Sequence, residues 1–369
     1  MLGLYNHTPR HEVKCLSQRA TRSRWASPVR ISYADQTMST TAPPSDAPAL
    51  GAYVTAALFD ARRQAMFALG DGTVRFEAGE TVEAHDGAVL CAVAHPSGDG
   101  MITGGDDGRL VWSRPQGAQV LAEIKGRWID AVAVSAASGL VACAAGREVQ
   151  VRDLADPAFA RAFAHDKSVS GLAFDPKGRR LAAATYGGVW LWYARIAEQT
   201  PQKLAWAGSH IAVAYSPDGR FLMSSMQESQ LHGWRLSDSK DLRMGGYPSK
   251  VKSLVFMAKG MLMATSGAPG AVVWPFGGAN GPMGKEAAEI GFDEASLVAR
   301  VAGTPGGTLL AAGLDDGRLW ACDLTSRQLQ TLKAEKGAPI TALAVTEDGR
   351  RLAWGDEDGD GGVLVIERE

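Results

Sequence analysis

The feature that most constrains the fold of this chain is a short pattern that recurs along most of its 369 residues. The clearest copy, VSGLAFDPKGRRLAAATYGGVWLW, runs from Val169 to Trp192. It consists of alternating runs separated by turns that contain Pro and Gly, which predicts three short antiparallel strands. One such unit cannot bury its apolar face in water, so each copy needs similar neighbours beside it.

About eight copies follow one another between Ala52 and the C-terminus. The glycine that closes the first turn measures the period and recurs at Gly98, Gly139, Gly178, Gly219, Gly260, Gly306 and Gly349. Neighbouring glycines are about 39 to 46 residues apart, close to the roughly 40–45 residues of a four-stranded propeller blade. A weaker fourth strand is expected between copies, in segments such as AQVLAEI and RQLQTLKA.

The copies resemble WD-repeat β-propellers in their Gly-Arg turns, in the SPDG at Ser216 to Gly219, and in the aromatic residue that ends the third strand. That residue is Trp192, Trp234 or Trp274 in three of the copies. The resemblance covers about nine-tenths of the chain, although Trp-Tyr, Trp-Arg and Trp-Pro replace the family's Trp-Asp dipeptide. It implies an all-β fold: a single closed β-propeller of about eight four-stranded blades, with seven blades as the alternative.

The predicted boundaries are an irregular N-terminal extension, residues 1–50, and a propeller, residues 51–369. The first 37 residues carry six Lys or Arg and two acidic residues, a net +4, which leaves −6 for the rest. We interpret Met38 as an alternative translation start; an organelle transit peptide is the other interpretation. The last copy lacks an outer strand, which VRISY from Val29 could supply; otherwise the last blade stays three-stranded.

Composition narrows the function further. The net charge of −2 argues against generic nucleic-acid binding. No apolar run approaches the roughly 18 residues needed to span a membrane. The four cysteines stand singly, without a CxxC pair, which favours a reducing compartment and predicts a cytoplasmic protein.

His85, Thr103 and Asp107 could be read as a nucleophilic triad. By resemblance, however, they occupy the positions of the structural network of WD repeats, in which a histidine, a hydroxyl and an aspartate hold a loop against its blade. We interpret them as that network, with Ser113 where the family has Trp. The corresponding turns of other copies hold Tyr186, Glu228 and Ala268, so most blades are expected to lack the network.

The segment from Asp356 to Glu367 matches the D-x-D-x-D-G-x5-E pattern of a calcium loop. Because residues 362–367 read as a strand, Glu367 would lie about 16 Å from the ion at 3.3 Å per residue. A partial calcium site at Asp356, Asp358 and Asp360 remains one alternative, and a Gly/Asp hairpin turn is the favoured interpretation. The loop from Gly278 to Lys285 lacks the residues of a phosphate loop. No cofactor is predicted.

In this family the loops before the first strand and between the second and third strands lie on one face of the ring. We expect an acidic arc on that face, formed by Asp71, Asp106, Asp107, Asp315, Asp316, Asp356, Glu357, Asp358 and Asp360. The opposite arc is aromatic and basic, and contains Arg127, Trp128, Arg147, Tyr186, Trp206, Tyr247 and Lys250. Aromatic and Arg residues on exposed loops are typical anchors of protein interfaces.

These observations predict a non-catalytic interaction scaffold, a monomeric ring that binds a protein or peptide on its loop face within a larger complex. The acidic arc predicts a basic partner. The alternatives are a propeller hydrolase or lyase with a central metal or acid/base site, and a calcium-gated binding module. The inner strands are largely Ala, Val and Leu, which argues against the enzyme.

Overall fold

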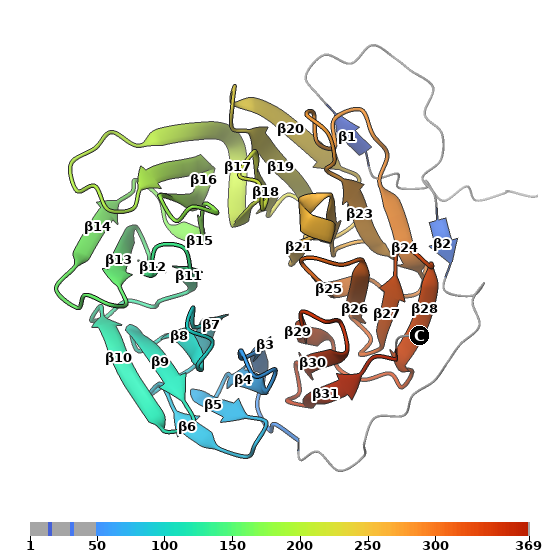
Figure 1. Ribbon diagram of the computed structural model, residues 1–369, viewed down its shortest axis with the longest axis horizontal. Coiled ribbons are helices and arrows are strands. Elements are labelled where there is room, and N and C mark those ends of the chain that lie inside the picture. The colour runs from blue at the N-terminus through green and yellow to red at the C-terminus, as the bar shows by residue number, and fades with distance from the viewer. Residues whose placement is uncertain (1–13, 17–29, 33–48, 368–369) are drawn as a thin grey trace, which may run out of the picture.

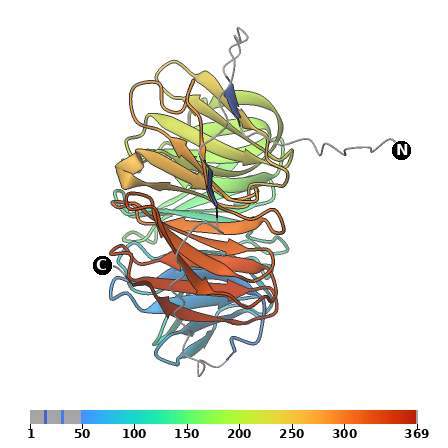
Figure 2. The same cartoon turned by 90° about the vertical axis from the view of Figure 1, so that its right-hand side faces the viewer.

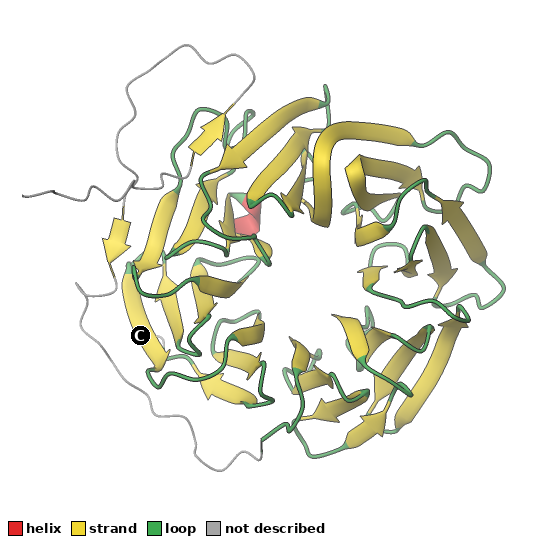
Figure 3. Ribbon diagram, turned by 180° about the vertical axis from the view of Figure 1, so that it is seen from behind, coloured by secondary structure: helices red, strands yellow, loops and turns green. Residues whose placement is uncertain are grey.

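The computed structural model describes residues 14–16, 30–32 and 49–367, and in these ranges the chain is almost entirely β-structure. The strands form small sheets arranged around a central opening (Figure 1). Seen from the side, the ring is a flat disc (Figure 2). One short 3₁₀ turn, η2 at Ala258–Gly260, is the single helical segment of the described residues (Figure 3).

The first three repeats each form a sheet of four antiparallel strands, in which the first strand is nearest the centre and the last is at the rim (Figure 1). Their bounds are β3 Val54–Phe59, β4 Ala65–Leu69, β5 Thr73–Phe76, β6 Thr81–Glu83, β7 Val89–Ala94, β8 Met101–Gly105, β9 Arg109–Arg114, β10 Gly117–Glu123, β11 Ala131–Ser135, β12 Leu140–Ala145, β13 Glu148–Asp153 and β14 Ala160–Ala164. The predicted fourth strands are present as β6, β10 and β14.

Repeats 4 and 5 share one seven-stranded sheet, because the long strand β17 pairs with strands of both repeats. Its bounds are β15 Val169–Phe174, β16 Arg180–Tyr193, β17 Gln202–Tyr215, β18 Phe221–Met226, β19 Gln230–Arg235, β20 Lys240–Gly245 and β1 Lys14–Leu16. The first part of β17 pairs with β16, and its last part, from His210, pairs with β18. One strand therefore ends repeat 4 and begins repeat 5.

The last three repeats complete the ring with sheets of five, four and three strands in the described residues. Their bounds are β21 Leu254–Met257, β22 Leu262–Thr265, β23 Ala271–Pro275, β24 Ala288–Phe292 with β2 Arg30–Ser32, then β25 Val298–Gly303, β26 Leu309–Leu314, β27 Leu319–Asp323, β28 Gln328–Lys333, and finally β29 Ile340–Val345, β30 Arg351–Asp356 and β31 Gly361–Val365.

The structure confirms the all-β closed propeller. Counted as hydrogen-bonded sheets the described ring has seven members, which is the seven-blade alternative. All eight sequence repeats are still present, since the seven-stranded sheet contains two of them.

The ring closes between the last and the first repeats. The Thr341 hydroxyl donates to the carbonyl of Val54 at 2.7 Å, and both residues are buried. In the turns between the first and second strands of the same two repeats, Arg63 pairs with Asp348 at 2.6 Å. Ala342 and Ala353 of repeat 8 belong to the same apolar cluster as Val54.

The segment VRISY does not supply the missing outer strand. Its residues Arg30–Ser32 form β2, which pairs in parallel with β24 of repeat 6. Repeat 8 is three-stranded in the described part of the chain. The predicted extension, residues 1–50, and the interpretation of Met38 lie mostly outside the described residues.

Burial explains why the repeats look as they do in the sequence. The second strand of a repeat is covered on both faces by neighbouring repeats, and β12 and β18 are buried at all six positions. The outermost strand β10 is mostly exposed, so its apolar signal is weak. Large side chains such as Trp274 and Phe221 fill the space between two repeats. Each contributes about 2–3 kcal/mol by leaving water.

Candidate functional site: the loop face of the ring

One face of the ring is formed by two kinds of loop: the turns between the second and third strands, and the connections from one repeat to the next. Backbone hydrogen bonds tie the two kinds together around the ring. Ile129 donates to the carbonyl of Gly105 at 3.0 Å, and Val169 donates to that of Gly146 at 2.8 Å. We call this surface the loop face. These bonds fix the positions of its loops.

The structure brings His85, Thr103 and Asp107 together in one hydrogen-bonded chain. His85 Nδ1 lies 2.9 Å from Asp107 Oδ1, and its Nε2 lies 2.8 Å from Thr103 Oγ1. Burial would raise the pKa of the Asp107 carboxyl, but the amides of Arg109 and Asp86 and the His85 ring outweigh it and lower that pKa. All three side chains are engaged with one another, an arrangement that holds the loop in place.

Related contacts occur in repeats where the sequence predicted none. At the start of repeat 6, the Tyr247 hydroxyl lies 2.7 Å from Thr265 Oγ1 and accepts the Trp274 indole N–H at 2.8 Å. In repeat 5, His210 Nδ1 lies 2.7 Å from Ser224 Oγ. These two repeats thus keep part of the network. The aspartate is missing, but a ring residue before or at the start of the first strand meets a hydroxyl on the second.

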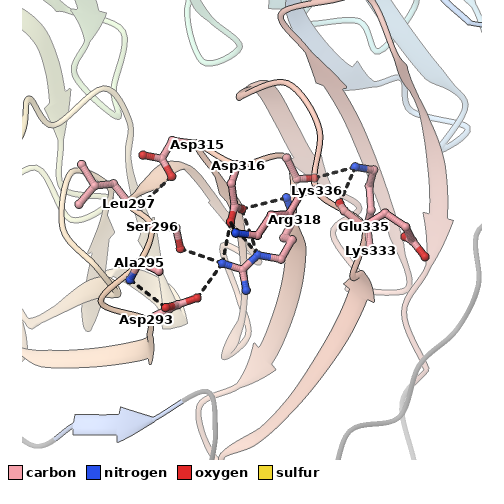
Figure 4. A network of polar contacts seen from close by, with 11 residues as sticks. Asp293, Ala295, Ser296, Leu297, Asp315, Asp316, Arg318, Lys333, Glu335 and Lys336 are labelled. Carbon is pink, nitrogen blue, oxygen red and sulfur yellow. Dashed lines mark hydrogen bonds and ion pairs between the residues drawn. The ribbon is translucent and has the colours of Figure 1, made fainter.

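The acidic arc contains cations that the sequence pattern did not reveal (Figure 4). Arg318 Nη2 pairs with Asp293 Oδ2 at 2.6 Å and with Asp316 Oδ2 at 2.7 Å. Lys336 lies 3.4 Å from the same Asp316 carboxylate. The Asp316 and Asp293 carboxylates raise the pKa of Arg318, whose side chain is only 13% exposed. Asp315 accepts the Leu297 amide at 2.8 Å.

The other carboxylates of the arc are also largely used within the fold. Asp71 accepts the amide and the hydroxyl of Thr73. Asp107 is bound to His85 as described above, and Asp106 is half-buried. Glu357, Asp358 and Asp360 are exposed. The expected arc is therefore not a uniformly acidic surface, because Arg318 and Lys336 lie within it.

Asp356 is 2% exposed and accepts the amides of Asp358 and Asp360 at 3.1 and 2.9 Å. Burial raises the pKa of its carboxyl. This is the geometry of a closed Asp-Gly hairpin turn. Across the described residues, no group of three or more His, Cys, Asp or Glu side chains is placed to hold a metal ion. The turn gives the calcium alternative no support.

The opposite arc includes side chains that are exposed and free. Trp128 is 67% exposed and Tyr186 is 61% exposed. Arg127, Arg147 and Tyr186 make no side-chain hydrogen bond or ion pair to other described residues, and all three are exposed. The loops that carry them are adjacent: Arg127 reaches the turn at Gly146, and the carbonyl of Arg147 accepts the amide of His165.

Two predicted members of this arc are structural. Tyr247 is 6% exposed and belongs to the Thr265–Trp274 network. Trp206 stacks on the buried His232 ring, with centroids 3.9 Å apart and planes at 15°. Lys250 is exposed. Sequence reasoning missed Lys167, which lies on the exposed connection between β14 and β15, two residues before Val169. The sequence could have indicated Lys167, because it lies in a loop that precedes a first strand and such loops belong to the loop face.

The fold and the repeat geometry define a β-propeller. The family model described as "WD domain, G-beta repeat" matches residues 77–112 and 159–192. Each match runs from the outermost strand of one repeat to the third strand of the next. The chain is therefore a β-propeller with two regions similar to WD repeats, and propellers built from such repeats typically serve as protein-interaction scaffolds.

SEC12-like protein 2 of Arabidopsis thaliana is 27% identical over 173 residues, which are 46% of this chain and 43% of that protein. The chain thus spans less than half the length of this relative. No helix of the described residues is long and apolar enough to cross a membrane.

Solved propellers share the fold. The computationally designed Ika8 protein matches with a TM-score of 0.69 and 21% identity, covering 86% of this chain and 98% of that one. The Cps50 (Swd1) propeller domain of Myceliophteria thermophila matches with a TM-score of 0.59 and 16% identity, covering 77% of this chain and 98% of that one. U3-55K matches with a TM-score of 0.56 and 16% identity, covering 76% of this chain and 96% of that one.

Proposed function

We propose that this protein is a non-catalytic scaffold that binds a protein or peptide partner on its loop face. The binding surface is the aromatic/basic patch, which we define as Arg127, Trp128, Arg147, Lys167 and Tyr186. The observation that carries the proposal is the exposure of two large aromatic side chains, Trp128 at 67% and Tyr186 at 61%. Neither contacts another ring or forms a side-chain hydrogen bond among the described residues.

The energetics favour binding at this patch. Covering the exposed parts of Trp128 and Tyr186 would contribute about 2–4 kcal/mol each, at roughly 25 cal/mol per Å² of apolar surface. The loops are already fixed by backbone bonds, such as the one from Val169 to the carbonyl of Gly146. Little conformational entropy is therefore lost when the partner binds.

Charge selects the kind of partner. Arg127, Arg147 and Lys167 are exposed, and none has an ion-pair partner among the described residues. An acidic segment with apolar residues would complement them. We therefore prefer an acidic partner at this patch to the basic partner that the acidic arc suggested, since Arg318 and Lys336 already lie in that arc. The free thiols of Cys91, Cys143 and Cys322 support a cytoplasmic location as part of the proposal.

The test is affinity capture from native lysate with the full chain and its W128A/Y186A variant. Both aromatic side chains are exposed, so their removal should change stability by no more than about 0.5 kcal/mol each. The matched control is Met261→Ala, an exposed apolar residue in a turn between first and second strands, away from the loop face.

We expect the wild type and the control to retain the same proteins, and the double variant to lose them. Charge reversal by R147E/K167E should lose the same proteins in a salt-dependent manner. Identical capture by all four proteins would contradict the proposal.

A further inference from the structure

The outer edge of β31 differs from every other rim of the described ring. Every sheet formed by repeats 1 to 7 has at least four strands, whereas the sheet of repeat 8 has three, and β31 is the last of them. Val365, near its end, is 65% exposed. An edge strand presents a row of backbone groups that can pair with another strand.

The register shows which groups those are. Ile366 donates to the carbonyl of Arg350, and Asp356 donates to that of Asp360, at 2.8 and 2.9 Å. In an antiparallel ladder, hydrogen-bonded and non-hydrogen-bonded pairs alternate. The even-numbered residues from 360 to 366 therefore bond to β30. The N–H and C=O groups of Gly361, Val363 and Val365 point away from it, and no described residue pairs with them.

The sheets of the two neighbouring repeats each have one strand more than repeat 8, so the space beside β31 corresponds to one strand. The ring accepts additional strands at other rims. β1 pairs with the outermost strand β20, and β2 pairs with the outermost strand β24. The edge of β31 also has no Lys, Arg, Asp, Glu or Pro between Gly361 and Val365, the residues that usually protect an edge from pairing.

The residues directly before the ring, 39–48, are poorly suited to this position by composition. Leu50 packs beside Gly361, so the chain enters the ring at the start of β31. Residues 39–48 include Pro43, Pro44 and Pro48, and proline has no N–H to donate to a ladder.

We propose that the edge of β31 binds an extended segment of a partner protein, which adds to repeat 8 as its fourth strand. Backbone pairing with Gly361, Val363 and Val365 would provide the affinity. Side chains of the guest strand that face repeat 7 would meet the apolar cluster that contains Leu332 and Leu364. The guest would therefore carry apolar residues at alternate positions. This site is separate from the aromatic/basic patch and does not depend on it.

The probe is a fluorescent peptide with the sequence of residues 327–334, RQLQTLKA, which contains β28, the fourth strand of repeat 7. The control peptide has proline in place of its first leucine and of its threonine. The binding partner is the full chain, compared with Val363→Pro, which removes one outward N–H and keeps the bonds made by residues 362 and 364. Binding is followed by fluorescence anisotropy, and amide hydrogen exchange is measured in parallel.

We expect the peptide to bind the full chain at least tenfold more tightly than it binds V363P, and the proline peptide to bind neither. In the free protein the Val363 and Val365 amides should exchange faster than the Leu364 amide, and the peptide should protect them. Slow exchange of Val363 and Val365 before peptide is added would mean that the chain itself fills the edge, which overturns the proposal. Fast exchange without peptide binding also overturns it. The exchange result decides the matter if V363P does not fold.

Discussion

Replacing His85 with alanine tests whether the His85–Thr103–Asp107 chain is structural. The substitution removes a hydrogen bond to the Asp107 carboxylate, worth about 1.5–3 kcal/mol, and one to the Thr103 hydroxyl, worth about 0.5–1.5 kcal/mol. The His85 side chain is fully buried, so a cavity is also left. We expect the free energy of unfolding to fall by about 3–4 kcal/mol.

The assay is urea denaturation at pH 7.5, followed by tryptophan fluorescence and by circular dichroism. A loss of this size should also lower the melting temperature by about 4–6 °C. The matched control is Asp86→Ala, the next residue along the chain. Its side chain is 73% exposed and pairs with Arg109, so its removal should cost no more than about 1 kcal/mol.

The reasoning would be refuted if H85A and D86A were equally stable. A hydrolytic activity lost in H85A without any loss of stability would instead support the triad interpretation.

Two further predictions concern buried positions. His232 is fully buried, and burial lowers its pKa to about 3, so the unfolded chain binds its proton first as the pH falls below about 6.5. The free energy of unfolding should therefore fall by about 2 kcal/mol between pH 8 and pH 5 because of this residue. His232→Phe keeps a ring against Trp206 and should remove that part of the pH dependence, as measured by denaturation curves at both pH values. An unchanged pH dependence in this variant would contradict the assignment. At Gly104, a Cβ would lie 2.7 Å from the carbonyl oxygen of Ile129 in the next repeat. Gly104→Ala should therefore destabilise the fold by about 1–3 kcal/mol. A melting temperature equal to that of the wild type would contradict this prediction and show that the next repeat shifts to make room.

The repeat period was enough to predict the ring, because each repeat buries its own apolar positions against the next. Strands such as β12 are buried on both faces, and their apolar runs are visible in the sequence. The sharing of β17 between repeats 4 and 5 could not be predicted. In β17 the chain continues as one strand through Gly208, where the other repeats have a loop, and no residue pattern in the sequence predicts this.

The candidate site was predicted in part, because loops could be assigned to a face while their side-chain partners could not. Asp316 looked like a free surface carboxylate, but its cations come from Arg318 in the same turn and Lys336 in the next connection. Tyr247 looked like an exposed loop aromatic and is instead the ring residue of a buried network. Trp128 and Tyr186 are exposed because no neighbouring loop covers them.

The most direct test of the account places a photoreactive benzoylphenylalanine at position 186 on the loop face and, in a second protein, at position 261 away from it. Both native side chains are exposed, Tyr186 at 61% and Met261 at 55%, so both proteins should fold. After irradiation in native lysate, the account predicts a discrete protein adduct from position 186 and none from position 261. An adduct from position 261 alone, or from neither position, would contradict binding on the loop face.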